Sequence, residues 1–242
     1  MCGIIGFNGF TRASPVLLEG IINLEYRGYD SVGMATVDNG VISVKKGVGK
    51  IADVHARINF DSLKGAMGVS HSRWATHGGV TEANCHPHFS SDQKIAVVHN
   101  GIIENYAEVK KSLEKKGRKF RSQTDTEVIP MLIEEEFKRT KDLQKAVRSA
   151  LLQLRGSYAI IVVSTLEPGK MIVARQDSPL LIGYAQDGMF AASDVTAFSK
   201  YTNKVVFLKD GQLAVLYKDK ADFFDLKSGK PVIETPKKID VN

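Results

Sequence analysis

The sequence predicts an α+β fold in which two antiparallel β-sheets pack face to face and helices cover both outer faces, a four-layer αββα sandwich. Strand-like segments occur early and late in the 242-residue chain, and helical segments lie between them. The connections between many of the strand-like segments are short enough for hairpins, which favours antiparallel sheets. Helices with a single apolar face need a sheet to cover, and this requirement completes the four layers.

The composition is that of a globular domain of enzyme size. Hydrophobic residues make up 43% of the chain and aromatic residues 8%, enough for a sizeable core. The chain has neither a basic segment at its start nor an apolar run of about 18 residues, so we expect no signal peptide, no membrane span and a cytoplasmic location. Cys2 and Cys85 form no CxxC pair, which is consistent with a reducing compartment and disfavours structural zinc.

The formal net charge of +6 comes from 33 basic and 27 acidic residues. Much of the excess lies in residues 110–121, KKSLEKKGRKFR, where Glu114 interrupts the basic run. One solvated helix face can carry this charge, so the sequence does not indicate nucleic-acid binding.

Residues 3–10, GIIGFNGF, are apolar and punctuated by glycine, which predicts a buried strand with close backbone approach. Ser14 as N-cap and Pro15 at the first helical position predict a following helix. Its apolar stripe is suited to packing on a sheet. Residues 32–37 and 41–46 then form a predicted antiparallel hairpin, because the intervening Asp-Asn-Gly is a strong turn signal.

Residues 47–52, GVGKIA, match the loose GxGxxA form of a dinucleotide-binding turn. That motif requires a parallel βαβ unit with an acidic residue at the end of the next strand. Here the preceding strand belongs to a hairpin, and the next predicted strand, residues 66–72, ends without an acid. A strand-to-helix turn is the favoured interpretation.

The loop after that strand gathers His77, His86 and His88 beside Cys85, so a metal site has to be considered. The spacing CHPH is not one that structural zinc sites use, and no HExxH motif supports it. Histidines that make ordinary hydrogen bonds are the favoured interpretation.

Residues 94–100, KIAVVHN, predict a strand that ends at Asn100-Gly101, where a side-chain amide and a backbone N–H lie side by side. Such a pair could bind an oxyanion.

Asn105 with Glu108, and Thr124 with Glu127, have the spacing of capping boxes and predict the starts of two helices. Asp125 would then lie in a first helical turn, where the helix dipole favours an acid for structural reasons alone. A third helix is predicted over residues 143–154. Seven strand-like segments follow it: GSYAIIVVS, KMIVARQ, PLLIGYA, GMFAAS, KVVFLKD, GQLAVLY and ADFFDL.

Cys2 would carry both a thiol and a free α-amine if Met1 were removed. An amine with a pKa of about 7.7 to 8.0 can accept the proton of a thiol with a pKa near 8.5, so one residue would supply nucleophile and base. On the first six residues alone, a cysteine buried as a small hydrophobe at the start of a strand is the simpler interpretation.

Five motifs, in this order and spacing, resemble those of the glutamine amidotransferases with an N-terminal nucleophile. They are CGIIG, EYRGYDS, SRWATHG, HNGIIEN and TDTEV. The forms YRGYDS and RWATHG are most similar to the glutaminase domains of glucosamine-6-phosphate synthases, rather than to the phosphoribosylpyrophosphate amidotransferases. The resemblance spans essentially the whole chain. It implies an αββα fold of the Ntn-hydrolase type and hydrolysis of L-glutamine to glutamate and ammonia through a thioester on Cys2.

The resemblance also assigns roles to residues at matching positions. Cys2 is expected to be the nucleophile with its amine as general base, and Asn100 and the Gly101 N–H are expected to bind the oxyanion. Arg73 and Asp125 are expected to pair the α-carboxylate and α-ammonium of glutamine, and their charges suit these groups. The remaining expected substrate-binding residues line or close the pocket: Trp74, Thr76, His77 and, in a loop over it, Arg27. Neither a metal ion nor another cofactor is expected.

The resemblance further implies how the domain is used. Residues 1–235 are expected to form the glutaminase domain, and residues 236–242 to begin a linker to sugar-isomerase domains that this chain does not include. Those domains would take the ammonia for hexosamine biosynthesis from fructose 6-phosphate, in an enzyme expected to be a homo-oligomer. Neither nucleic acid nor a membrane is an expected partner. The competing hypothesis is a binding or regulatory module in which Met1 is retained and Cys2 is structural.

Overall fold

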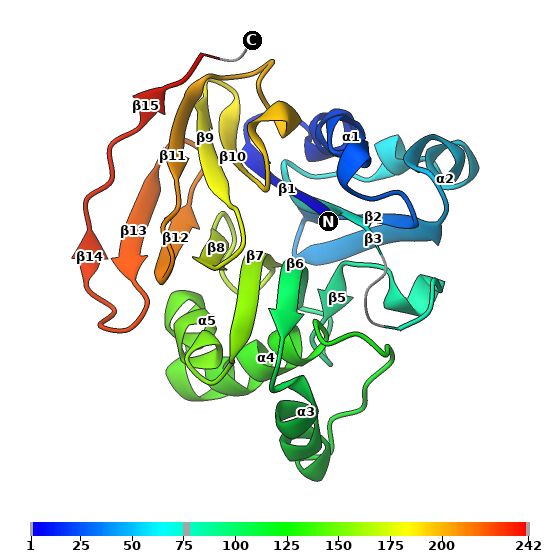
Figure 1. Ribbon diagram of the computed structural model, residues 1–242, viewed down its shortest axis with the longest axis vertical. Coiled ribbons are helices and arrows are strands. Elements are labelled where there is room, and N and C mark those ends of the chain that lie inside the picture. The colour runs from blue at the N-terminus through cyan, green and yellow to red at the C-terminus, as the bar shows by residue number, and fades with distance from the viewer. Residues whose placement is uncertain (1, 75–77, 241–242) are drawn as a thin grey trace.

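The strands form two antiparallel sheets in the computed structural model, which describes residues 2–74 and 78–240 (Figure 1). The first sheet contains, in order across it, β15 (Lys237–Lys238), β11 (Lys204–Phe207), β9 (Leu181–Ala185), β10 (Gly188–Ala192), β1 (Gly3–Gly9), β4 (Met67–Arg73), β2 (Ser31–Asp38) and β3 (Val41–Val48). The second contains β14 (Pro231–Val232), β13 (Ala221–Asp225), β12 (Gln212–Leu216), β8 (Met171–Gln176), β7 (Gly156–Ser164), β6 (Ile95–Ile103) and β5 (His88–Phe89).

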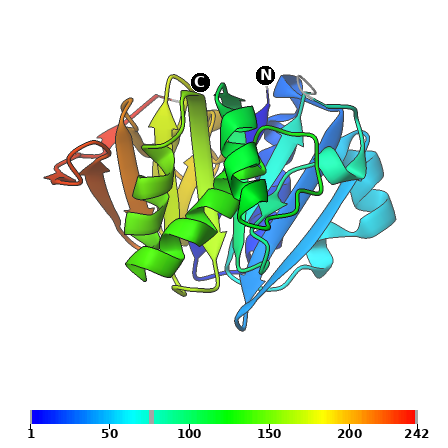
Figure 2. The same cartoon turned by 90° about the horizontal axis from the view of Figure 1, so that it is seen from below.

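The α-helices cover the outer faces of the two sheets (Figures 1 and 2). They are α1 (Ala13–Asn23), α2 (Ile51–Ile58), α3 (Tyr106–Lys115), α4 (Val128–Thr140) and α5 (Leu143–Leu151). One hydrophobic core lies between the sheets and consists mainly of strand residues. A second joins α1 and α2 to the first sheet, and a third joins α3, α4 and α5 to the second sheet. The predicted four-layer αββα sandwich is therefore confirmed.

β1 runs through the middle of the first sheet between β10 and β4, and all of its residues are buried. A Cβ added to Gly6 would lie 2.9 Å from both Ile161 Cγ2 and Met171 Sδ, on strands of the facing sheet. Glycine therefore allows the two sheets to approach closely at this point. The strand that begins next to Cys2 is thus fixed on both sides and from the facing sheet.

The two predicted turns of the first half are confirmed. Asn39 and Gly40 have φ angles of 48° and 77°, the left-handed conformation that a two-residue hairpin turn between β2 and β3 requires. Gly49, with φ of 121°, follows β3 and precedes α2, so residues 47–52 form a strand-to-helix turn after a hairpin. A dinucleotide-binding βαβ unit is absent from this part of the described chain.

The start of α1 differs slightly from the prediction. The helix begins at Ala13 with Arg12 at the N-cap, so Ser14 lies in the first turn instead of capping it. The Ser14 hydroxyl donates a hydrogen bond of 2.8 Å to the carbonyl oxygen of Leu63. A tertiary partner has therefore replaced the local capping bond.

The predicted capping box at Thr124 and Glu127 does not form. α4 begins only at Val128, with Glu127 at the N-cap and no side-chain capping bond. The Glu127 carboxylate instead accepts hydrogen bonds from the backbone N–H groups of Arg121 and Ser122, which precede it. Asp125 consequently lies in an irregular connection, and the expectation that it belongs to a first helical turn is wrong.

The end of the described chain joins the first sheet. Lys237 and Lys238, expected in a linker that starts at residue 236, form β15 and pair with Val205 and Lys204 of β11. β11 would otherwise be an edge strand with unpaired backbone groups, which explains why the tail pairs with it. No helix within residues 2–74 and 78–240 is both long and apolar enough to cross a membrane.

Candidate active site

Cys2 lies at the start of β1, where the neighbouring strand β4 ends. The antiparallel register pairs Gly3 with Ser72, so the chain beyond this pair brings Cys2 alongside Arg73 and Trp74. The Trp74 backbone N–H donates to Cys2 Sγ at 3.2 Å, and the thiol lies 3.5 Å from the Trp74 carbonyl oxygen. The pairing of β1 with β4 therefore holds the thiol where β1 begins and β4 ends, in the middle of the first sheet.

The end of β6 supplies the second part of the site from the opposite sheet. Asn100 Nδ2 donates a hydrogen bond of 2.9 Å to the carbonyl oxygen of Cys2. Gly101 has φ of 124°, and a Cβ at this position would lie 2.2 Å from the carbonyl oxygen of Ser157. Only glycine fits there without displacing the backbone of β7. The Asn-Gly pair thus joins the two sheets next to the nucleophile.

Asp125 is brought to the site by the connection between α3 and α4. Its Oδ2 accepts a hydrogen bond of 2.7 Å from the backbone N–H of Ile103, just beyond Gly101. The residue is buried, with 7% of its surface exposed. Thr126 Oγ1 lies 2.8 Å from His99 Nδ1, and Thr124 Oγ1 lies 3.0 Å from His88 Nε2. Hydrogen bonds on both sides of Asp125 therefore fix the backbone that carries it.

These elements surround one small cavity. It is lined by Cys2, Arg73, Trp74, His86, His99, Gly101, Thr124, Asp125 and Thr126. The cavity thus combines a thiol, a buried cation and a buried anion, contributed by both sheets and by the connection before α4.

The Arg73 side chain is almost fully buried, with 4% of its surface exposed. Its Nη1 donates to the carbonyl oxygen of Gly79 at 3.1 Å, and its Nη2 to that of Gly78 at 3.4 Å. These two carbonyl groups orient the guanidinium. A buried cation in a cavity is well suited to bind a carboxylate.

The remaining predicted residues have different positions. The Trp74 side chain is 44% exposed, and its ring packs edge to face against that of Tyr29, with 5.4 Å between the ring centroids. The contact of Trp74 with Cys2 is made by its backbone. Arg27 is not among the residues that line the cavity; its Nη1 donates to the Ser193 carbonyl oxygen at 3.1 Å and pairs with Asp194 at 3.4 Å. In this conformation it holds the segment after β10. Thr76 and His77 lie outside the described residues.

Sequence reasoning missed four cavity residues: His86, His99, Thr124 and Thr126. For three of them the available signal was position, because His99 immediately precedes Asn100 and the two threonines flank Asp125. His86 was considered only as a possible metal ligand. The threonine hydroxyls contact histidines that belong to distant segments. Such partnerships depend on the tertiary fold and could not be read from local patterns.

The buried histidines form one cluster where β4 and β6 face each other. His71 Nε2 donates across the sheets to the carbonyl oxygen of His99 at 3.2 Å, and the rings of His71 and His86 stack at 3.9 Å. Burial lowers the pKa of His71 to about 3, and it holds the pKa values of His86 and His88 well below their usual range. Burial also lowers the pKa of His99. The cluster is therefore neutral at physiological pH.

Among the described residues, no three His, Cys, Asp or Glu side chains are arranged to hold a metal ion. Cys85 Sγ is buried and contacts the carbonyl oxygen of Thr81 at 3.3 Å, while His88 bonds to Thr124. His86 Nδ1 accepts from the backbone N–H of His99 at 3.4 Å, so His86 and His88 make ordinary hydrogen bonds as predicted, and His77 lies outside the described residues.

The surroundings of Cys2 keep its thiol protonated. Burial raises the pKa of the Cys2 thiol, and the hydrogen bond from the Trp74 backbone only partly opposes this effect. Since the thiolate is the reactive form, the thiol needs a base to act as a nucleophile.

A second cavity, of about 800 Å³, is lined by residues 117–121 and by Glu127 of the connection before α4, and by Val44 and Phe89. It does not include Cys2, Arg73 or Asp125. We therefore assign the chemistry to the smaller cavity.

The αββα sandwich with a cysteine at the start of a central strand defines the class of N-terminal-nucleophile hydrolases. Residues 71–200 match the family described as a glutamine amidotransferase domain, and the chain belongs to that family. It is 26% identical to the glutamine phosphoribosylpyrophosphate amidotransferase from B. subtilis, with a TM-score of 0.81 over 93% of this chain and 49% of that chain.

The chain is more similar in sequence to glutamine–fructose-6-phosphate aminotransferases of the isomerizing type. It is 50% identical over 229 residues to that of Pyrococcus horikoshii, covering 95% of this chain and 38% of the relative. It is 49% identical over 236 residues to that of Thermococcus kodakarensis, covering 98% of this chain and 39% of the relative. The chain thus spans about two fifths of the length of these relatives.

Proposed function

We propose that this chain hydrolyses L-glutamine to L-glutamate and ammonia, with Cys2 as the nucleophile. The observation that carries the proposal is the cavity that joins the Cys2 thiol to Arg73 and Asp125. A free amino acid brings one carboxylate and one ammonium into the pocket, and each must meet an opposite charge to compensate for lost hydration. Arg73 suits the carboxylate and Asp125 the ammonium, which leaves the side-chain amide for Cys2.

The reaction begins when the α-amine of Cys2, free after removal of Met1, accepts the thiol proton. Sγ then bonds to the amide carbon, and the C=O electron pair moves to oxygen to give a tetrahedral oxyanion. The amine returns the proton to the leaving nitrogen, the C–N bond breaks, and ammonia departs from a thioester. A water molecule, deprotonated by the same amine, attacks the thioester and releases glutamate and the thiol.

Asn100 and Gly101 are the proposed oxyanion donors. The amide nitrogen of Asn100 carries two hydrogens, and its bond to the Cys2 carbonyl uses one of them. The other would stabilise the oxyanion together with the backbone N–H of Gly101, a residue that lines the cavity. The same amide would thus both orient Cys2 and stabilise the transition state.

We further propose that the ammonia serves amino-sugar synthesis. The similarity to isomerizing glutamine–fructose-6-phosphate aminotransferases supports this role, as does the fact that the chain matches about two fifths of their length. Sugar-isomerase domains that bind fructose 6-phosphate would be the partners, reached by the chain beyond β15. In their absence this chain should release free ammonia and form no glucosamine 6-phosphate.

Substitution of Cys2 tests the proposed hydrolysis. Cys2→Ala should abolish ammonia release from L-glutamine, while calorimetry should show glutamine binding within about threefold of the unmodified chain, because Arg73 and Asp125 still hold the substrate. Cys85→Ala, which changes the buried thiol outside the cavity, is the matched control and should retain activity. Undiminished ammonia release from the Cys2 variant would overturn the proposal.

A further inference from the structure

The connection from Lys116 to Glu127 carries Asp125, yet neither adjoining helix holds that residue directly. α3 ends at Lys115 and α4 begins at Val128, so the intervening backbone is irregular. Irregular segments sample many conformations unless specific contacts restrict them. Asp125 has a single backbone donor, the Ile103 N–H, on its carboxylate among the described residues. The hydrogen bonds of Thr124 and Thr126 hold the two residues beside Asp125, and other contacts must fix the rest of the connection.

Glu127 closes the second half of the connection on itself. Its carboxylate accepts from the Ser122 backbone N–H and from the Ser122 hydroxyl, both at 2.7 Å, and from the Arg121 backbone N–H at 2.9 Å. The residue is buried, with only 3% of its surface exposed. A buried carboxylate with several donors has a strong preference for one geometry, because each lost bond leaves a desolvated polar group. Residues 121–127, which include Asp125, therefore form a loop that the Glu127 carboxylate closes.

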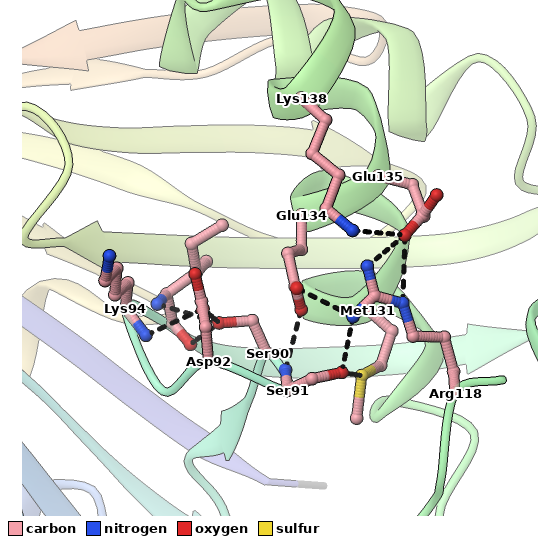
Figure 3. Close-up of polar contacts among 10 residues, drawn as sticks. Ser90, Ser91, Asp92, Lys94, Arg118, Met131, Glu134, Glu135 and Lys138 are labelled. Atoms are coloured by element: carbon pink, nitrogen blue, oxygen red, sulfur yellow. Dashed lines mark hydrogen bonds and ion pairs between the residues drawn. The ribbon is translucent and has the colours of Figure 1, made fainter.

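Arg118 anchors the first half of the connection to two other elements (Figure 3). Its Nε donates to Glu135 at 2.9 Å and its Nη1 to Glu134 at 2.7 Å, both on α4. The same Nη1 donates to the hydroxyl of Ser91 at 2.9 Å, and Glu134 also accepts from the Ser91 backbone N–H at 2.7 Å. The guanidinium thus connects the loop to α4 and to the turn between β5 and β6.

The Arg118 network is well shielded from water. The side chains of Arg118 and Glu134 are 12% and 8% exposed, so their charge-assisted bonds are screened less than those of surface pairs. By contrast, Arg139 pairs with Glu136 on the same helix, but its side chain is 68% exposed. Exposed pairs of this kind contribute little. Arg139 on α4 is therefore a matched surface control for Arg118, the anchoring arginine of the connection.

We infer that Arg118 and Glu127 are positioning residues that hold Asp125 where it pairs the α-ammonium of the substrate. This inference rests on the proposed hydrolysis of glutamine. A carboxylate must be held within a fraction of an ångström to bind a cation well, so loosening its backbone weakens binding before it affects the reacting amide. Neither residue lines the smaller cavity that contains Cys2, and each acts through the connection.

The test is a double-mutant cycle between Arg118 and Asp125, measured on the chain with Met1 removed. Arg118→Met should raise KM for L-glutamine about tenfold with kcat within about twofold. In the Asp125→Asn background the same change should leave kcat/KM within about twofold, because the group it positions is already gone. Glu127→Gln should behave like Arg118→Met, and Arg139→Met should match the unmodified chain in both backgrounds.

These results distinguish a specific effect on the position of Asp125 from a general loosening of the structure. An equal loss of kcat/KM from Arg118→Met in both backgrounds would show general loosening and overturn the inference, as would a variant indistinguishable from Arg139→Met. Thermal unfolding identifies a variant that fails to fold, and Arg118→Lys, which keeps the charge but not the forked geometry, then takes its place in the cycle. If the unmodified chain itself released no ammonia, the proposed hydrolysis, rather than the positioning role, would be contradicted.

Discussion

At the scale of single residues, the chemistry depends on how Cys2 loses its proton. Burial raises the pKa of the thiol, so the protein does not hold a ready thiolate. The histidines that line the cavity are neutral, and one of them, His99, faces Thr126 and Ser157 rather than the thiol. We therefore propose the α-amine of Cys2, free after removal of Met1, as the base. Retention of Met1 would convert that amine to a peptide nitrogen without basicity.

Asn100→Ala should lower kcat for glutamine hydrolysis by about a hundredfold or more, the usual effect of losing one oxyanion donor. KM should change much less, because the substrate's charged groups contact other residues. The measurement is a steady-state assay of ammonia release over a range of glutamine concentrations. A raised KM with an unchanged kcat would remove Asn100 from the oxyanion role.

At the scale of elements, the sequence predicted β6 and the Asn-Gly pair but not how the strand ends. The strand was expected to stop at Asn100 and instead continues to Ile103, through a glycine with positive φ. The spacing of Thr124 and Glu127 predicted a helix start, although both side chains bond elsewhere. Local spacing cannot distinguish a capping box from a loop whose side chains have tertiary partners. Cys2, Arg73 and Asp125 could be named as candidates because each lies in a local motif, and the fold brings all three to one cavity.

Gly101→Ala should destabilise the protein more than Gly117→Ala. Both glycines have positive φ, 124° and 82°, but a Cβ at Gly117 would meet nothing within 4 Å, whereas at Gly101 it would clash with the Ser157 carbonyl. Gly117→Ala should cost about 1 kcal/mol from backbone strain alone. Gly101→Ala should cost at least about 2 kcal/mol more and reduce activity. Urea unfolding of both variants decides this, and equal effects would contradict the packing argument.

At the scale of the whole molecule, the sandwich places its site where the two sheets meet. Alternating apolar residues and hairpin turns were sufficient to predict the four layers. The histidine cluster was not predicted as a unit, because His71, His86, His88 and His99 come from both sheets and a loop. Its buried rings exclude water, and His88 and His99 form hydrogen bonds with Thr124 and Thr126, which flank Asp125. The fold thus contributes a neutral, buried wall to the site.

This cluster should make the protein sensitive to acid. The folded chain keeps the pKa of His71 at about 3, below the unperturbed 6.5, and burial lowers the pKa values of the other three. At pH values between the lowered pKa of a folded-state histidine and the unperturbed pKa, the unfolded chain binds a proton that the folded chain excludes. The free energy of unfolding therefore falls as pH falls. The stabilisation is complete above about pH 6.5 and is lost progressively below it.

The free energy of unfolding, measured by urea titration, should therefore decrease between about pH 7 and about pH 5. Each histidine that is protonated only in the unfolded chain contributes up to about 1.4 kcal/mol per pH unit. A free energy of unfolding that stays constant across this range would show that the cluster takes up protons in the folded state.

The central claim is that Cys2, with its own amine as base, hydrolyses glutamine. The most direct measurement compares ammonia release from L-glutamine by two forms of this chain, one beginning at Cys2 and one retaining Met1, each verified by intact mass. The form beginning at Cys2 should release ammonia, and the form with Met1 should be slower by about a hundredfold or more, the usual contribution of a general base. Equal rates from the two forms, or no ammonia from the form that begins at Cys2, would contradict the claim.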